Sequence, residues 1–173
     1  VGSSAGAFRF ACFAQHNPVK AISQLAQTYA TTTYGKRATS TEITEKAVAM
    51  VDEILTGESQ SQVIQNSLIQ LNIIVAKSTG FLVKKESKIP QLAGLTHSYL
   101  LNRQRRENLA KHYQRVVFQQ QNSALTILDP YNIPTHYVEL TKDNIKQAVL
   151  ASCAIPLVID GVKNISEAGA GMY

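Results

Sequence analysis

Segments with helical periodicity alternate along this chain with short runs of β-branched residues. Helices are predicted over residues 5–15, 19–30, 40–55 and 143–153, and strands over residues 68–76, 115–119, 124–128 and 135–140. Asn17-Pro18 and Pro156 separate neighbouring elements, because the residue before a proline avoids the helical region and proline has no N–H to donate. This alternation predicts an α/β fold in which a sheet is flanked by helices.

Several helix ends carry their own signals. Thr39 and Glu42 have the spacing of a capping box and predict the start of the third helix, while Gly57 is suited to the left-handed position just after its end. Thr141 is expected to cap the helix that ends before Pro156.

Size and composition indicate one globular domain over residues 1–173. The chain is 45% apolar and 17% charged, which is ordinary for a folded domain that needs no metal or disulfide to hold it. Cys12 and Cys153 lack the spacing of a metal site, so we expect no metal and no cofactor. No apolar run approaches the roughly 20 residues that span a bilayer, and no signal peptide is visible at Val1. We therefore expect a cytoplasmic protein that associates with membranes only peripherally.

The net charge of +5 is concentrated in a basic, helical region over residues 77–115. This region has a net charge of +7, because only Glu86 and Glu107 oppose its nine basic residues: Lys77, Lys84, Lys85, Lys88, Arg103, Arg105, Arg106, Lys111 and Arg115. Such a stretch is typical of a solvated helix face, but it also suits an anionic partner such as lipid headgroups or nucleic acid.

The pattern Gly2-Ser3-Ser4-Ala5-Gly6 stands directly before the first predicted helix. In this spacing a serine lies on a sharp strand-to-helix turn that exposes its Oγ, and the glycines let the turn close without Cβ clashes. The N–H groups of Ala5 and Gly6 would then face the charge that develops on an attacked carbonyl. The alternative interpretation is an ordinary helix cap rich in glycine and serine.

A serine nucleophile needs a base, and no histidine here belongs to a motif. His16, His97, His112 and His136 are scattered along the chain. Asp160, beside Gly161, is the most suggestive carboxylate, although a plain turn residue is the favoured interpretation.

Together, Gly2 to Ala7 and Ala151-Ser152-Cys153-Ala154-Ile155-Pro156 resemble the patatin-like phospholipase family. Residues 136–150, 155–162 and 171–173 are also similar to the family, while residues 31–132 match it only loosely. The resemblance implies a patatin-like sheet flanked by helices, with a helix-rich central insertion. It implies that Ser4 is the nucleophile of a Ser–Asp dyad in an elbow containing Gly2, Ala5 and Gly6, and that Ser152 and Pro156 lie near the active site.

The implied activity is hydrolysis of phospholipids or other acyl-ester lipids, without histidine, metal or cofactor. The family's glycine-rich oxyanion loop would precede Val1 and its Asp-Gly-Gly or Asp-Gly-Ala motif would follow Tyr173. We therefore expect residues 1–173 to be an incomplete fragment of one catalytic domain, inactive or nearly so by itself. Two alternatives stay open: a non-catalytic basic module that binds a membrane surface or nucleic acid, and a patatin-fold pseudoenzyme. Neither the oligomeric state nor the preferred lipid follows from the sequence.

Overall fold

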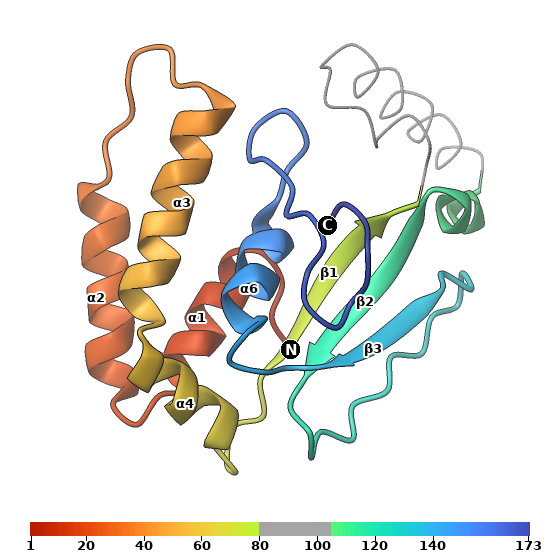
Figure 1. The fold of residues 1–173 in the computed structure, drawn as a ribbon, viewed down its shortest axis with the longest axis horizontal. Helices are drawn as coiled ribbons and strands as arrows, with labels where there is room; N and C mark the ends of the chain where they lie inside the picture. Colours follow the sequence, from red (N-terminus) through yellow and green to blue (C-terminus); the bar gives the residue numbers. More distant parts are fainter. Residues whose placement is uncertain (80–104) are drawn as a thin grey trace.

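The structure, a computed structural model, describes residues 1–79 and 105–173, and its helices and strands alternate in the way that an α/β fold requires (Figure 1). In chain order the elements are α1 (Ala5–Phe13), α2 (Pro18–Thr31), α3 (Ser40–Ile54), α4 (Gly57–Gln65), β1 (Asn72–Ser78), the 3₁₀ helix η2 (Arg106–Lys111), β2 (Tyr113–Gln119), β3 (Thr135–Glu139) and α6 (Ile145–Cys153). The α/β class is confirmed. Of the helices in this described part, none has both the length and the apolar composition needed to cross a membrane.

The sheet is mixed and has the strand order β1-β2-β3. β1 runs antiparallel to β2, and β2 runs parallel to β3. The outer edge of β1 is extended by two single-residue bridges, one from Gly2, parallel to Ile73, and one from Met172, antiparallel to Ser78. Residues from both ends of the sequence therefore meet at one edge of the sheet.

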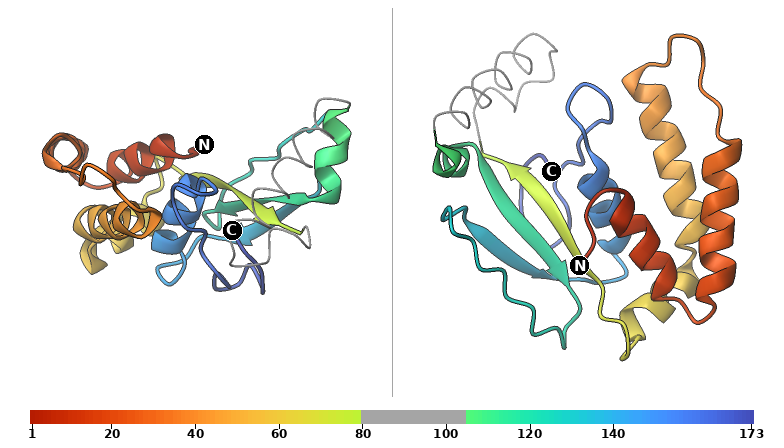
Figure 2. Two further views of the ribbon diagram at one scale, coloured as in Figure 1. Left: turned by 90° about the horizontal axis from the view of Figure 1, so that it is seen from above. Right: turned by 180° about the vertical axis from the view of Figure 1, so that it is seen from behind.

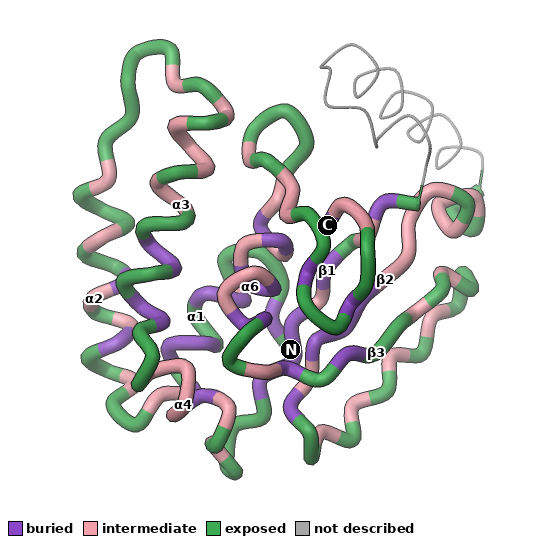
Figure 3. The backbone as a smooth tube through the Cα atoms, in the orientation of Figure 1, coloured by how far each residue is buried: buried purple, intermediate pink, exposed green. Residues whose placement is uncertain are grey.

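The core forms between this sheet and the helices beside it (Figure 3). α6 packs against β1, and α1 and α3 pack against α6, with α2 bridging α1 and α3. The right-hand view in Figure 2 shows α1 to α4 gathered on the β1 side, with β3 at the far edge. The buried side chains at the centre include Ile73, Val75, Val116, Phe118, Ile145, Ala148 and Val149.

Local signals placed the first three helices well. Asn17 caps α2, with its side chain accepting from Lys20 N–H at 3.0 Å, and Pro18 occupies the first turn. Thr39 caps α3 by accepting from Glu42 N–H at 3.2 Å. The Glu42 carboxylate does not return to Thr39, however, but accepts from Gly35 N–H and Lys46.

Three expectations about helix ends and strands were wrong. Gly57 does not terminate α3; it begins α4, because the Thr56 side chain accepts from Ser59 N–H and caps a new helix. Thr141 does not cap α6, which starts at Ile145 after the buried Asn144, whose side chain instead accepts from Thr141 N–H. Residues 124–128 form no strand, and the N–H of Ile127 donates to the Tyr137 hydroxyl rather than to a neighbouring strand.

The strand predicted over residues 68–76 begins later, at Asn72, and ends at Ser78. Residues 66–69 instead form a turn, in which the Asn66 side chain accepts from the N–H groups of Leu68 and Ile69. The basic region 77–115 was expected to be helical, but its two ends are strands, because Lys77 lies on β1 and Arg115 on β2. Residues 80–104 of this region, including His97, lie outside the described residues.

Residues 162–173 are tightly packed although they form no helix or longer strand. Tyr173 is 3% exposed, and its hydroxyl donates to the carbonyls of Ala168 and Gly169. The ammonium group of Lys77 on β1 lies 4.9 Å from the centre of the Tyr173 ring and donates to Ala168 O at 3.0 Å. These contacts fasten residues 162–173 to the sheet.

Candidate functional site

Gly2 pairs with the edge of the sheet just before the first helix, α1. Its N–H donates to Asn72 O at 2.7 Å, and its carbonyl accepts from Ile74 N–H at 2.9 Å. Three residues later α1 begins at Ala5. The strand-to-helix turn predicted from the Gly-x-Ser-x-Gly spacing is therefore present, with Ser4 at its corner.

Ser4 adopts φ 52° and ψ −131°, a conformation that residues other than glycine rarely adopt. Such a backbone costs on the order of 1–3 kcal/mol and persists only where the surrounding structure enforces it. Here the bridge of Gly2 to β1 and the start of α1 enforce it from both sides. The Ser4 side chain is consequently exposed rather than packed inward.

The two glycines of the motif differ in what they contribute. A Cβ on Gly2 would lie 2.8 Å from Ala7 Cα and 3.0 Å from Ala7 N, so α1 can pass this close only over a glycine. A Cβ on Gly6 would meet nothing nearer than Phe10, at 4.0 Å. Gly2 is therefore required sterically, whereas the expectation of a Cβ clash at Gly6 was wrong.

The two N–H groups expected to face an oxyanion differ in their hydrogen bonding. The Gly6 N–H donates to Ser3 O at 2.9 Å, and this bond closes the turn. The Gly6 N–H is therefore not free to donate to an oxyanion. The Ala5 N–H has no acceptor among the described residues. Ala5 follows the candidate nucleophile, and the residue in that position supplies one oxyanion donor in nucleophile elbows.

The end of α6 lies directly against this turn. Ser152 Oγ accepts from Ser4 N–H at 2.8 Å, and the Ser4 side chain hydrogen-bonds to the Cys153 thiol. Burial raises the pKa of Cys153 to about 11, although the Ser4 hydrogen bond opposes this shift. Cys153 is therefore a neutral thiol at neutral pH and is buried, whereas Ser4 is exposed, so Ser4 is the more accessible candidate nucleophile of the two.

An apolar cavity of about 560 Å³, hereafter the main cavity, opens beside Ser4. Its walls come from α1, α2, α3 and the segment after α6. Phe8, Leu25 and Met50 contribute to these walls, and among the described residues Arg9 is the only charged one that lines it. A cavity of this size and lining suits the apolar part of a small-molecule substrate.

A second cavity of about 330 Å³ adjoins the main one, and Ile159 lines both. Pro156, which was expected near the active site, lines this second cavity and not the main one. Asp160 lines it as well, and its N–H donates to the Thr44 hydroxyl at 2.9 Å. The structure thus places Ser4 and Ser152 together, with Pro156 and Asp160 in the neighbouring cavity.

No histidine or carboxylate from the described residues lines the main cavity. His16 lies just beyond the far end of α1, where its N–H donates to the Gln62 side chain. His136 is on β3, the strand farthest from Gly2 in the sheet. Within the described ranges, no cluster of three His, Cys, Asp or Glu residues could hold a metal ion.

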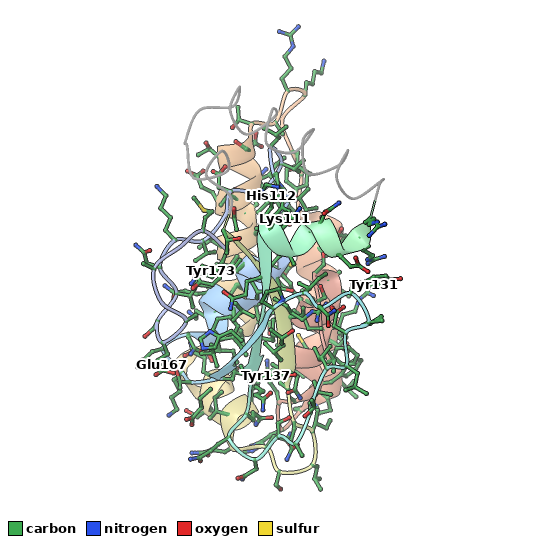
Figure 4. All side chains as sticks on the ribbon, turned by 90° about the vertical axis from the view of Figure 1, so that its right-hand side faces the viewer. Lys111, His112, Tyr131, Tyr137, Glu167 and Tyr173 are labelled. Atoms are coloured by element: carbon green, nitrogen blue, oxygen red, sulfur yellow. The ribbon has the colours of Figure 1, made fainter. Side chains whose placement is uncertain are left out.

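Several basic residues of the region 77–115 make contacts within the fold. The Arg115 guanidinium forms an ion pair with Asp129. The Arg106 guanidinium lies 5.2 Å from the centre of the Tyr131 ring. Figure 4 shows Tyr131 beneath η2. Lys77 is held by Ala168 and Tyr173. Lys84, Lys85, Lys88 and Arg103 lie outside the described residues.

Sequence reasoning missed the main cavity and the packing of Tyr173, because both arise between segments far apart in the chain. No protein-family model, curated protein or solved structure matches this chain.

Proposed function

We propose that this chain carries the nucleophile of a serine-dependent lipid acyl hydrolase, with Ser4 as the attacking residue. The observation that supports it most is the backbone of Ser4, at φ 52° between a strand bridge and a helix N-terminus. A strained turn that exposes a hydroxyl beside an apolar cavity suits nucleophilic attack.

In the proposed reaction the acyl chain of the ester occupies the main cavity. Ser4 Oγ attacks the acyl carbonyl and loses its proton to a carboxylate base, while the Ala5 N–H donates to the developing oxyanion. The proton then passes to the leaving alcohol as the ester bond breaks. Water, deprotonated by the same base, hydrolyses the acyl–Ser4 ester and restores the free hydroxyl.

The base is the part of this proposal that depends on the resemblance to patatin-like phospholipases. That resemblance implies an aspartate outside residues 1–173 and a sheet arranged as in that family. The proposal therefore concerns the full-length protein, and residues 1–173 alone are expected to be inactive or nearly so.

The test is labelling of the full-length protein with a fluorophosphonate probe, followed by peptide mass spectrometry. We expect the probe on Ser4, and we expect hydrolysis of p-nitrophenyl acyl esters that Ser4→Ala abolishes. Ser3→Ala is the matched control, because Ser3 is the exposed neighbour whose contribution to the turn is its main-chain carbonyl. A folded full-length protein that neither reacts with the probe nor cleaves any ester would contradict the proposal.

One observation favours the pseudoenzyme as a second candidate, namely that no described carboxylate or histidine lines the main cavity. A pseudoenzyme would bind acyl lipids in the main cavity without cleaving them. Lipid binding by the wild-type full-length protein, with no acyl product over a prolonged incubation, would select this candidate.

A further inference from the structure

Five consecutive residues without a polar side chain follow α6 and form a surface loop, Ile155 to Ile159. Ile155, Leu157 and Val158 are 51%, 41% and 43% exposed. Exposing a continuous run of apolar residues to water costs free energy, and such a run normally marks a site of interaction.

The loop is held in this exposed form. Leu157 adopts φ 70°, which is an outlier for a bulky residue. The Ile155 carbonyl accepts from the N–H groups of both Val158 and Ile159 at 2.9 Å, so a compact turn fixes the strained residue. Asp160 N–H then ties the end of the loop to Thr44 on α3. A hydrogen-bonded turn therefore holds these apolar side chains at the surface.

A second loop, residues 32–39 between α2 and α3, projects at the same end of the molecule (Figure 1). It exposes Tyr34, at 51%, and the basic residues Lys36 and Arg37. Tyr34, Ile155 and Ile159 all line the main cavity, so the two loops form part of its rim.

The charge at this end favours an anionic partner. Neither Lys36 nor Arg37 forms an ion pair within the described residues, whereas the nearby Glu42 carboxylate is neutralised by Lys46. Asp160 places one carboxylate at the base of the apolar loop. The outer tip of residues 32–39 thus presents two adjacent cations.

We propose that these two loops dock the protein on an anionic lipid surface. Ile155, Leu157 and Val158 enter the acyl region, and Tyr34 lies at headgroup level, where amphipathic rings are favoured. Lys36 and Arg37 bind the headgroup phosphates. An apolar insertion combined with basic residues is the pair of signals that stable peripheral binding requires. Two separate projecting tips suit a deformable lipid surface better than the matched face of a protein.

This docking does not depend on the proposed chemistry at Ser4. Ser4→Ala is expected to bind vesicles as the wild type does, so a failure of catalysis and a failure of docking are distinguishable.

The absence of tryptophan from the 173 residues allows a direct test in the full-length protein, with any other tryptophan replaced by phenylalanine. Val158→Trp places a fluorescent probe in the apolar loop, and Leu68→Trp is the matched control. Leu68 is 93% exposed in the segment between α4 and β1, at the opposite end of the fold.

Both variants are mixed with vesicles of phosphatidylcholine and phosphatidylglycerol. The indole emission of the Val158→Trp protein should shift to shorter wavelength and be quenched by lipids brominated in their acyl chains. Unchanged emission from this protein, or equal responses from both variants, would overturn the proposal.

The role of the cations is tested by sedimentation with vesicles. Lys36→Gln with Arg37→Gln should weaken binding to phosphatidylglycerol-containing vesicles by about tenfold or more. The control pair is Lys20→Gln with Lys142→Gln, two exposed lysines at the start of α2 and before α6. Equal losses in the two pairs would contradict a specific docking surface.

The competing occupant of the apolar loop is a second copy of the chain. Analytical ultracentrifugation distinguishes it, because a dimer that Val158→Asp dissociates would overturn lipid docking as the function of this surface. Circular dichroism and thermal melting of each variant confirm that it is folded.

Discussion

The main-chain N–H of Ser4 donates a 2.8 Å hydrogen bond to the Oγ of Ser152, a residue 148 positions later in the chain. This bond joins the strained turn to the last part of α6, and the neighbouring Cys153 contacts the Ser4 side chain. The helix α6, which packs against β1, therefore restrains the candidate nucleophile Ser4.

Ser152→Ala removes the acceptor for the Ser4 N–H. We expect the free energy of unfolding to fall by about 1 kcal/mol, the typical net value of one such bond. We also expect slower fluorophosphonate labelling of Ser4 in the full-length protein, because the turn loses one restraint. Denaturant titration and labelling time courses measure the two effects, with the exposed Ser166→Ala as control. A Ser152→Ala protein with unchanged stability and labelling would show that the bond restrains nothing.

Gly2→Ala and Gly6→Ala separate the two glycines of the motif. The Gly2 Cβ would press on the backbone of Ala7, which cannot move without shifting α1, so we expect a loss of about 1–3 kcal/mol. Gly6 lies inside α1 with open space around its Cα, so alanine there should be neutral or stabilising by up to about 1 kcal/mol. Urea denaturation of both variants checks the order, and a Gly6→Ala protein less stable than Gly2→Ala would refute it.

Gln120 is a buried amide that joins α4 to the sheet. Its Nε2 donates to Val63 O at 2.7 Å and Ile64 O at 2.9 Å, and its Oε1 accepts from Leu71 N–H at 2.6 Å. Gln120→Ala would leave the Leu71 N–H and the Ile64 carbonyl without this partner, while Val63 O keeps its bond from Asn66 N–H, and we expect a loss of about 3 kcal/mol in urea denaturation. Gln70→Ala is the control: the side chain of this exposed glutamine makes one bond, to Asn122 O, and its loss should change stability by about 0.5 kcal/mol or less. Equal losses in the two variants would contradict the assigned role of Gln120.

Asp129 introduces a pH dependence of stability. The Arg115 guanidinium and, secondarily, the Tyr131 N–H lower the pKa of Asp129 below its usual value. A carboxylate whose pKa is lowered by folding contributes stability above its unfolded pKa of about 3.9, and this contribution disappears as pH falls through the folded pKa.

Asp129→Asn should therefore be less stable than the wild type near neutral pH, and the difference should shrink as pH falls below about 4. Urea midpoints measured over a pH series give this difference. Asp143→Asn, at an exposed aspartate with no ion pair in the described part of the chain, is the control. A difference that stays constant down to the lowest pH would contradict the assignment.

Local sequence signals predicted much of the secondary structure. Helix caps act within one turn, so Asn17 and Thr39 define the starts of α2 and α3 wherever those helices pack. The same local reasoning failed at Gly57, because α4 has only one buried residue, Val63, and therefore no apolar stripe to detect. It also failed at residues 124–128, since a short apolar run becomes a strand only where a neighbouring strand pairs with its backbone.

By itself, the sequence determined the α/β class, the first helices and the turn at Ser4, because spacing, caps and glycines act over a few residues. Tertiary structure alone decided that Ser152 supports Ser4, that an apolar cavity opens beside it, and that Tyr173 is buried against Lys77. Tertiary packing also turned Arg106 and Arg115 toward Tyr131 and Asp129, although in the sequence they look like solvent-facing charges. These outcomes depend on which distant segments of the chain pack against one another. A pattern confined to neighbouring residues does not specify those contacts.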